Sequence, residues 1–160
     1  MQELEKKLNY TFRNRELLSE ALNHSSYANE HRSAGVNSNE RLEFLGDSVL
    51  GFVTAEFLFA KHPDLPEGDL TRIRAALVCE QSLHEVAQKL ELGRHLKLGR
   101  GEESGGGRQR PSILADATDA HIPATPPPTT TKSYFASFIS FWSYSSRNTA
   151  SSVMSEGGRN

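Results

Sequence analysis

The stretch from residue 39 to residue 50 reads NERLEFLGDSVL, and its spacing predicts both a helix and a candidate site. At about 100° per residue, Glu40, Glu43 and Asp47 fall within a sector of roughly 60° on one helical face. Four apolar residues fall on nearly the opposite side: Leu42, Leu45, Val49 and Val53. The pattern is typical of an amphipathic helix with separate acidic and apolar faces.

The rest of the first 116 residues also has helical periodicity and lacks the alternation expected of strands. We expect helices over 3–8, 15–22, 39–61, 70–77 and 80–92, and a further helix that begins at Pro111. Asn14 and Asp69 are candidate N-caps, while residues 27–39 and the glycine-rich residues 99–110 are expected to be loops. The sequence therefore predicts an all-α fold.

The composition changes after residue 116. Residues 1–116 contain 18 leucines, whereas residues 117–160 contain none and draw 15 of their 44 positions from serine and threonine. Prolines at positions 123, 126, 127 and 128 interrupt any helix there. We expect one helical domain over residues 1–117 and a Ser/Thr/Pro-rich tail over residues 118–160 that is mostly disordered.

Net charge and hydropathy constrain the function less than the spacing of the acidic residues does. A net charge of −2 does not by itself indicate a protein that binds nucleic acid. No stretch reaches the roughly 18 consecutive apolar residues of a membrane span. The charged first seven residues are not followed by the apolar core of a signal peptide. We expect a cytoplasmic protein without a membrane partner.

The acidic face of residues 40–47 has two interpretations. Carboxylates on one helical face repel one another by roughly a few tenths of a kcal/mol per pair, which a divalent cation would offset. A solvated acidic surface is the alternative, and it stays open. A second pair, Asp116 and Asp119, is three residues apart, and Glu67 lies in a turn before a helix. Oxygen ligands without a His/Cys cluster suit Mg²⁺ or Mn²⁺, which serve phosphoryl chemistry.

Four segments resemble, in the same order, sequence blocks of the ribonuclease III family. They are HSSY at residues 24–27 with Asn29 and Glu30 after it, NERLEFLGDSVL at residues 39–50, PEGDLT at residues 66–71 and PSILADA at residues 111–117. The match at residues 39–50 is specific enough to name the family. The resemblance covers residues 1 to about 117 and implies the helical endonuclease domain of ribonuclease III.

The resemblance also implies roles for individual acids. Glu43 and Asp116 correspond to magnesium ligands, and Asp47 corresponds to a catalytic acid beside the metal. Asp119 stands where the family has a glutamate that acts as both catalytic acid and metal ligand, and its side chain is one methylene shorter. Together these residues imply a Mg²⁺-dependent enzyme, with Mn²⁺ as a possible substitute.

Glu40 and Glu67 correspond to acids that help form the cleft and bind substrate. The implied activity is endonucleolytic hydrolysis of double-stranded RNA, leaving 5′-phosphate and 3′-hydroxyl ends, in the processing of ribosomal and other RNA precursors. The family also implies a homodimer, in which two sites cut the two strands of one duplex.

The chain departs from the family pattern after Asp116. The helices expected there, and the C-terminal domain that binds double-stranded RNA, have no counterpart in the sequence, so we expect a fold incomplete at its C-terminal end. Two alternatives to a working nuclease follow: a non-catalytic module that binds duplex RNA or a partner, and an inactive product. The acids at 43, 47 and 116 favour the nuclease. Arg108 and Arg110 could touch phosphate or remain solvated.

Overall fold

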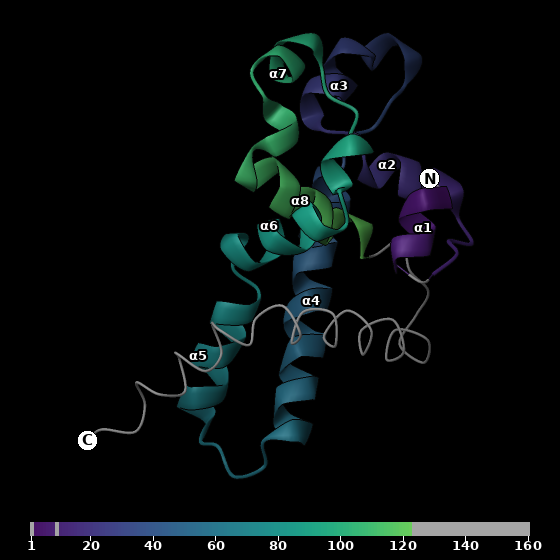
Figure 1. Cartoon of the computed structure of the whole chain (residues 1–160). Coiled ribbons are helices and arrows are strands. Elements are labelled where there is room, and N and C mark those ends of the chain that lie inside the picture. The colour runs from purple at the N-terminus through teal and green to yellow at the C-terminus, as the bar shows by residue number, and fades with distance from the viewer. Residues whose placement is uncertain (1, 9, 123–160) are drawn as a thin grey trace.

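The computed structural model describes residues 2–8 and 10–122, which are helical with short connections (Figure 1). The helices, with η for a turn of 3₁₀ helix, are α1 (Gln2–Leu8), α2 (Arg15–Ala21), α3 (Ser25–Glu30), η1 (Arg32–Ala34), α4 (Glu40–Lys61), α5 (Glu67–Leu77), α6 (Glu80–Lys89), η2 (Leu92–Arg94), α7 (Arg100–Ser104), η3 (Gly107–Gln109) and α8 (Pro111–His121). The all-α prediction is confirmed. No helix in this part of the chain has the length and apolar character needed to cross a membrane.

Helix α8 lies at the centre of the fold. It packs against α4, α6 and α2, and Figure 1 shows it surrounded by the other helices. From Ile113 to Ile122 every residue is buried except Asp116, which is partly buried. Alanines at positions 115, 117 and 120 keep the side chains short where neighbouring helices approach. A site formed on α8 is therefore held from several sides.

The main hydrophobic core joins both ends of the described chain. Leu4, Leu8 and Phe12 pack in one cluster with residues of the second half, which include Val86, Leu92, Ile113 and Ala117. A parallel bridge between Asn23 and Lys97 adds a backbone link between the two halves. The helices around α8 thus form one packed unit.

Helix α4 is the longest helix, and α5 packs beside it (Figure 1). Its buried residues follow a spacing of four: Leu42, Gly46, Leu50, Thr54 and Leu58. Val49 and Val53 pack against the core as expected. The prediction that Leu45 belongs to the packed face is wrong, because α8 crosses α4 at Gly46 and Leu45 stays exposed.

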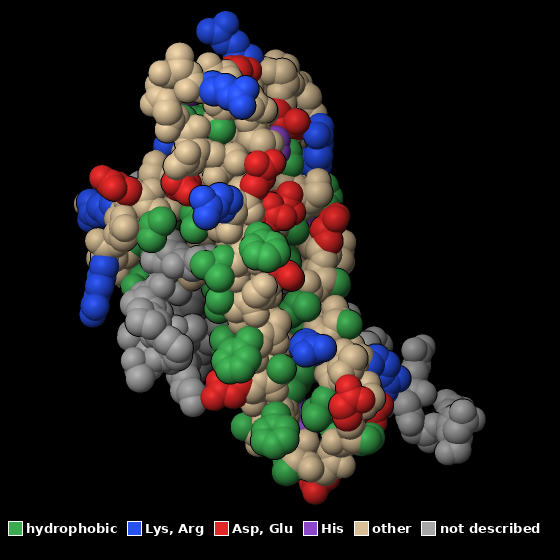
Figure 2. All heavy atoms as spheres, turned by 180° about the vertical axis from the view of Figure 1, so that it is seen from behind, with side chains coloured by type: hydrophobic (Ala, Val, Ile, Leu, Met, Phe, Trp, Pro, Cys, Tyr) green, Lys and Arg blue, Asp and Glu red, His purple; other side chains and the backbone are tan. Residues whose placement is uncertain are grey.

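One face of α4 carries large apolar side chains that contact solvent. Figure 2 shows hydrophobic side chains aligned along this face of the molecule. Phe44, Leu45, Phe52 and Phe59 are 78%, 49%, 68% and 76% exposed, and we call them the apolar stripe. At helical spacing these four positions share a sector of about 100°. Such a patch is unusual on a monomer and typical of an interaction surface.

Two of the three local signals for helix starts are confirmed. The Asn14 side chain accepts hydrogen bonds from the backbone N–H groups of Glu16 (3.0 Å) and Leu17 (3.1 Å) at the start of α2. Pro111 occupies the first turn of α8. Asp69, in contrast, does not cap a helix: α5 starts two residues earlier, and Asp69 forms an ion pair with Arg72 (2.9 Å) instead.

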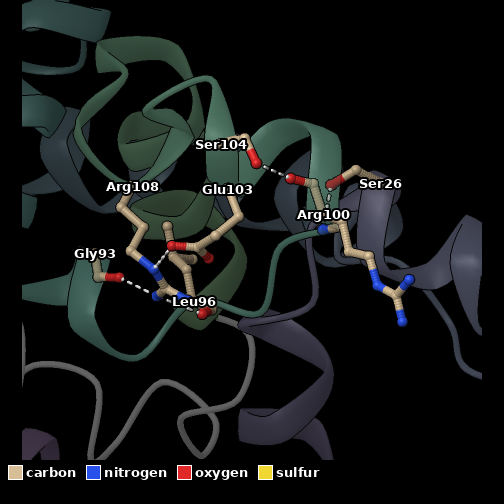
Figure 3. Close-up of polar contacts among 8 residues, drawn as sticks. Ser26, Gly93, Leu96, Arg100, Glu103, Ser104 and Arg108 are labelled. Carbon is tan, nitrogen blue, oxygen red and sulfur yellow. Dashed lines mark hydrogen bonds and ion pairs between the residues drawn. The ribbon is translucent and has the colours of Figure 1, made fainter.

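Both segments expected to be loops contain helical turns. Helix α3 and η1 lie within residues 25–34, and α7 and η3 lie within residues 100–109. Tertiary contacts hold them: the Ser26 hydroxyl accepts from the Gly99 N–H (2.8 Å), and the Glu30 carboxylate accepts from the Arg100 N–H (2.7 Å). Figure 3 shows Ser26 beside the start of α7. Contacts between distant segments cannot be predicted from local sequence periodicity.

The predicted change of character at residue 117 falls inside α8, which continues to His121. Residues 118–122 are buried, so the helical domain extends beyond the predicted boundary at residue 117. The rest of the predicted tail, residues 123–160, lies outside the described residues.

Candidate active site

Two helices contribute the acids at the centre of the candidate site. Glu43 and Asp47 lie on α4, and Asp116 and Asp119 lie on α8. The two helices approach closely where they cross, because a Cβ added at Gly46 would overlap the backbone carbonyl of Asp119. This crossing places the four carboxylates near enough to interact electrostatically. We call these four residues the acidic cluster.

Asp119 is the most buried member of the acidic cluster. Asp119 is only 8% exposed, and its Oδ1 has no hydrogen-bond partner within the part of the chain that the structure describes. Burial, followed by the charges of Asp47, Glu43 and Asp116, raises the pKa of Asp119 to about 7. An acid held in this way favours its protonated form until a cation or a proton donor offsets its charge.

Glu43 and Asp116 show the same effect more weakly. Burial is the largest cause of the raised pKa of Glu43, and the charges of Asp116, Glu40 and Asp47 add to it. Burial also raises the pKa of Asp116. Because acids of both helices raise one another's pKa values, the acidic cluster is a mutually repelling group and not a set of isolated surface charges.

Two neighbours of Asp116 were not among the predicted site residues. The carboxylate of Glu80, the first residue of α6, contributes to the raised pKa of Asp116, whereas His24 acts in the opposite direction. Sequence spacing gave no reason to place either residue here, since Glu80 and His24 are 36 and 92 positions away from Asp116. The proximity of Glu80 depends on the packing of α6 against α8, and that of His24 on the position of residues 21–24 beside α4 and α8.

The two acids predicted to bind substrate occupy different places. Glu40 is exposed at the start of α4, where it accepts a hydrogen bond from the Ser38 hydroxyl (2.8 Å) and adds to the charge around Glu43. Glu67 begins α5, beyond the far end of α4, and accepts from the Thr71 hydroxyl (2.8 Å). Within one chain, Glu40 borders the acidic cluster and Glu67 does not.

The acidic cluster fits a hard divalent cation by the chemistry of its donors. All four side chains offer carboxylate oxygens, the ligands that Mg²⁺ and Mn²⁺ prefer. The unpartnered Oδ1 of Asp119 supplies a buried acceptor that a cation would satisfy. Among residues 2–8 and 10–122, no three His, Cys, Asp or Glu side chains converge closely enough to share an ion as they stand. Side-chain rotation would be needed to complete such a site.

Known proteins share the sequence of this helical domain. A family model described as Ribonuclease-III-like matches residues 14–125. The protein named Ribonuclease 3 from Oceanobacillus iheyensis is 51% identical over 121 residues, which cover 76% of this chain and 53% of that protein. Ribonuclease 3 from Listeria monocytogenes is 50% identical over 123 residues, covering 77% of this chain and 54% of that protein. The chain thus spans about half the length of these relatives.

Solved structures give the same fold. Two structures of the nuclease domain of ribonuclease III from Campylobacter jejuni match with TM-scores of 0.71 and 0.72, at 45% and 38% identity. The first covers 77% of this chain and 82% of its own, and the second 93% and 95%. The first is described as showing structural flexibility in a region involved in dimer formation of that protein. By sequence and by fold, the chain belongs to the ribonuclease-III-like family.

Proposed function

We propose that this chain is an endonuclease that hydrolyses phosphodiester bonds of double-stranded RNA with the help of Mg²⁺, or of Mn²⁺ in its place. The observation that carries the proposal is the acidic cluster, above all the buried Asp119 with its unpartnered Oδ1. A group of repelling carboxylates weakens a fold, and a catalytic cation explains why this fold has one. Family membership supports the same reaction class.

Glu43 and Asp116 would hold the cation, with Asp119 as a third ligand. A bound divalent cation supplies Lewis acidity toward the phosphate and lowers the pKa of a water molecule. Asp47 is exposed at the edge of the acidic cluster, so its carboxylate can orient the attacking water and accept its proton. The cut would leave a 5′-phosphate and a 3′-hydroxyl. The proposed substrates are ribosomal and other RNA precursors, processed in the cytoplasm.

A homodimer is part of the proposal. The apolar stripe exposes three phenylalanines on α4, a surface that a second copy of the chain could cover. If two stripes packed antiparallel, Glu67 of one copy would approach the acidic end of α4 in the other. Glu40 and Glu67 could then line one substrate cleft from two chains, although they lie apart within a single chain.

The organisation of the chain is proposed as a catalytic domain over the described helices followed by the Ser/Thr/Pro-rich tail. Arg108 and Arg110 do not support the alternative of a non-catalytic RNA-binding module. Arg108 donates to the Gly93 and Leu96 carbonyls (2.8 Å each) and Arg110 forms an ion pair with Glu102 (2.7 Å). Both cations are therefore engaged within the protein.

Cleavage of a labelled RNA duplex in Mg²⁺ tests the function directly. We expect cutting by the parent chain, none in EDTA, and a loss of at least about 100-fold in Asp47→Asn, because that variant lacks the proton acceptor. Asp64→Asn, at an exposed acid outside the acidic cluster, serves as the matched control and should cut at the parent rate.

Equal rates for Asp47→Asn and the parent would refute the assignment of Asp47. A soluble, helical parent chain that binds duplex RNA without cutting it would favour the non-catalytic module instead.

A further inference from the structure

His24 is held in one orientation by the residues around it. It is the N-cap of α3, and its Nδ1 accepts a hydrogen bond from the backbone N–H of Ser26 (3.2 Å). The Ser26 hydroxyl lies 2.8 Å from the same nitrogen and itself accepts from the Gly99 N–H (2.8 Å). The Ser26 O–H can therefore donate a hydrogen bond to Nδ1.

These contacts determine the tautomer of the His24 ring. A backbone N–H can only donate, so Nδ1 must be an acceptor and the ring hydrogen must lie on Nε2. No hydrogen-bond partner of Nε2 is found among residues 2–8 and 10–122, and the side chain is only partly buried. His24 thus presents a fixed N–H donor for which the described part of the chain offers no acceptor.

The chain segment that carries His24 lies beside the two helices of the acidic cluster. The Asn23 carbonyl accepts from the Asn39 N–H (2.8 Å), directly before α4, and the Asn39 side chain donates to the Ala21 carbonyl (3.3 Å). Ala21 and Ala120 of α8 are buried in one cluster. Residues 21–24 therefore lie against both helices that supply the acids.

We infer that His24 is a positioning residue for the metal-binding carboxylates, with its Nε2–H aimed at Asp116 or at a water held by it. This inference rests on the proposed function, since it assigns to His24 the orientation of a ligand to the proposed cation. The placement follows from the position of residues 21–24 against α4 and α8, and the influence of His24 on the pKa of Asp116 agrees with it. Outer partners that orient metal ligands change metal affinity by about 10- to 100-fold when removed.

Two substitutions separate this role from helix capping. In His24→Asn, the amide oxygen can replace Nδ1 as the cap acceptor, but nothing replaces Nε2–H. In His24→Gln, the longer amide can place an N–H near the position of Nε2, but the cap is weakened. A residue that only caps α3 would be replaced well by Asn, whereas a residue that positions Asp116 would be replaced better by Gln.

The measurement is Mn²⁺ binding to the full chain, followed by electron paramagnetic resonance without RNA, together with thermal melting. We expect His24→Asn to melt like the parent but to bind Mn²⁺ about tenfold more weakly. His24→Gln should recover part of that affinity despite a lower melting temperature. Asp116→Asn marks the level of binding without the proposed ligand.

The outcomes distinguish the two proposals. Parent-like Mn²⁺ affinity in His24→Asn would overturn the role of His24 and leave the metal site intact. A parent chain that binds Mn²⁺ no better than Asp116→Asn would overturn the metal site itself, and the role of His24 with it.

Discussion

Charged side chains have opposite surroundings in the acidic cluster and in the α7–η3 segment. In the α7–η3 segment two arginines are paired. Arg108 contacts Glu103 (2.6 Å) and two backbone carbonyls (Figure 3). Arg110 forms an ion pair with Glu102 (2.7 Å). In the acidic cluster, carboxylates from two helices face one another, and Asp119 Oδ1 is buried without a partner. Both regions lie on the same rigid core.

The paired charges stabilise the fold, whereas the repelling carboxylates destabilise it. Paired charges hold two turns of helix in place and need no ligand. Unpaired acids destabilise the folded chain, so their arrangement calls for a cation or a reaction. Removing a charge should therefore raise stability in the acidic cluster and lower it in the α7–η3 segment.

The largest expected effect comes from adding a side chain where α4 and α8 are in closest contact. In Gly46→Ala the new methyl group would overlap the Asp119 carbonyl, so the helices would have to separate. We expect a loss of about 5 kcal/mol, at the upper end of single-residue effects. Chemical denaturation followed by circular dichroism measures it.

Gly51→Ala is the matched control for the same helix, because nothing lies within 4 Å of a Cβ at Gly51. It should leave stability unchanged or raise it, since alanine favours helix. Equal effects of the two substitutions would show that α4 and α8 are not in close contact at Gly46.

An intermediate effect is expected from Asp119→Asn, and it should depend on pH. Folding raises the pKa of Asp119 from 3.8 to about 7, so this residue's stabilising contribution is complete below pH 3.8 and lost as pH rises through 7. In EDTA, the variant should gain about 2 kcal/mol over the parent near pH 8, less than the full shift because the buried amide also lacks a partner.

The gain should shrink toward pH 5, where the parent carboxyl is mostly protonated. Denaturation curves at both pH values measure the difference. A gain that is constant with pH would mean that Asp119 ionises normally in the folded chain.

The smallest of these effects is expected in the α7–η3 segment. Arg108→Ala removes an ion pair and two hydrogen bonds to the Gly93 and Leu96 carbonyls, and we expect a loss of about 1.5 kcal/mol. Arg100→Ala is the control, because the Arg100 side chain points away from these contacts in Figure 3. If Arg108→Ala is as stable as the Arg100 variant, the Arg108 contacts do not hold the segment.

Local sequence patterns predicted the helices that depend on local signals. The acidic face of α4, the Asn14 cap and Pro111 at the start of α8 could all be read from spacing and residue type. The resemblance to ribonuclease III named the acids of both helices, and the structure brings four of them together. Their catalytic and ligand roles remain predictions.

The features that escaped prediction depend on contacts between distant residues. The Ser26 hydroxyl and the Glu30 carboxylate accept hydrogen bonds from the N–H groups at the start of α7. The burial of α8 follows from the helices that pack on several of its sides. The composition places the end of the domain at residue 117, because no leucine follows and prolines begin at position 123. The last turns of α8 are instead buried through alanines and a threonine. Leu45 was placed in the core because the crossing point at Gly46 could not be known.

The core that joins Leu4 and Leu8 to Ile113 and Ala117 has a consequence for protein synthesis. The first helix leaves the ribosome more than one hundred residues before its packing partners on α8. Until then the leucines of α1 can contact only the earlier members of their cluster, such as Leu18 and Leu22. Because the cluster is complete only with Ala117, we expect the finished core to form late in translation.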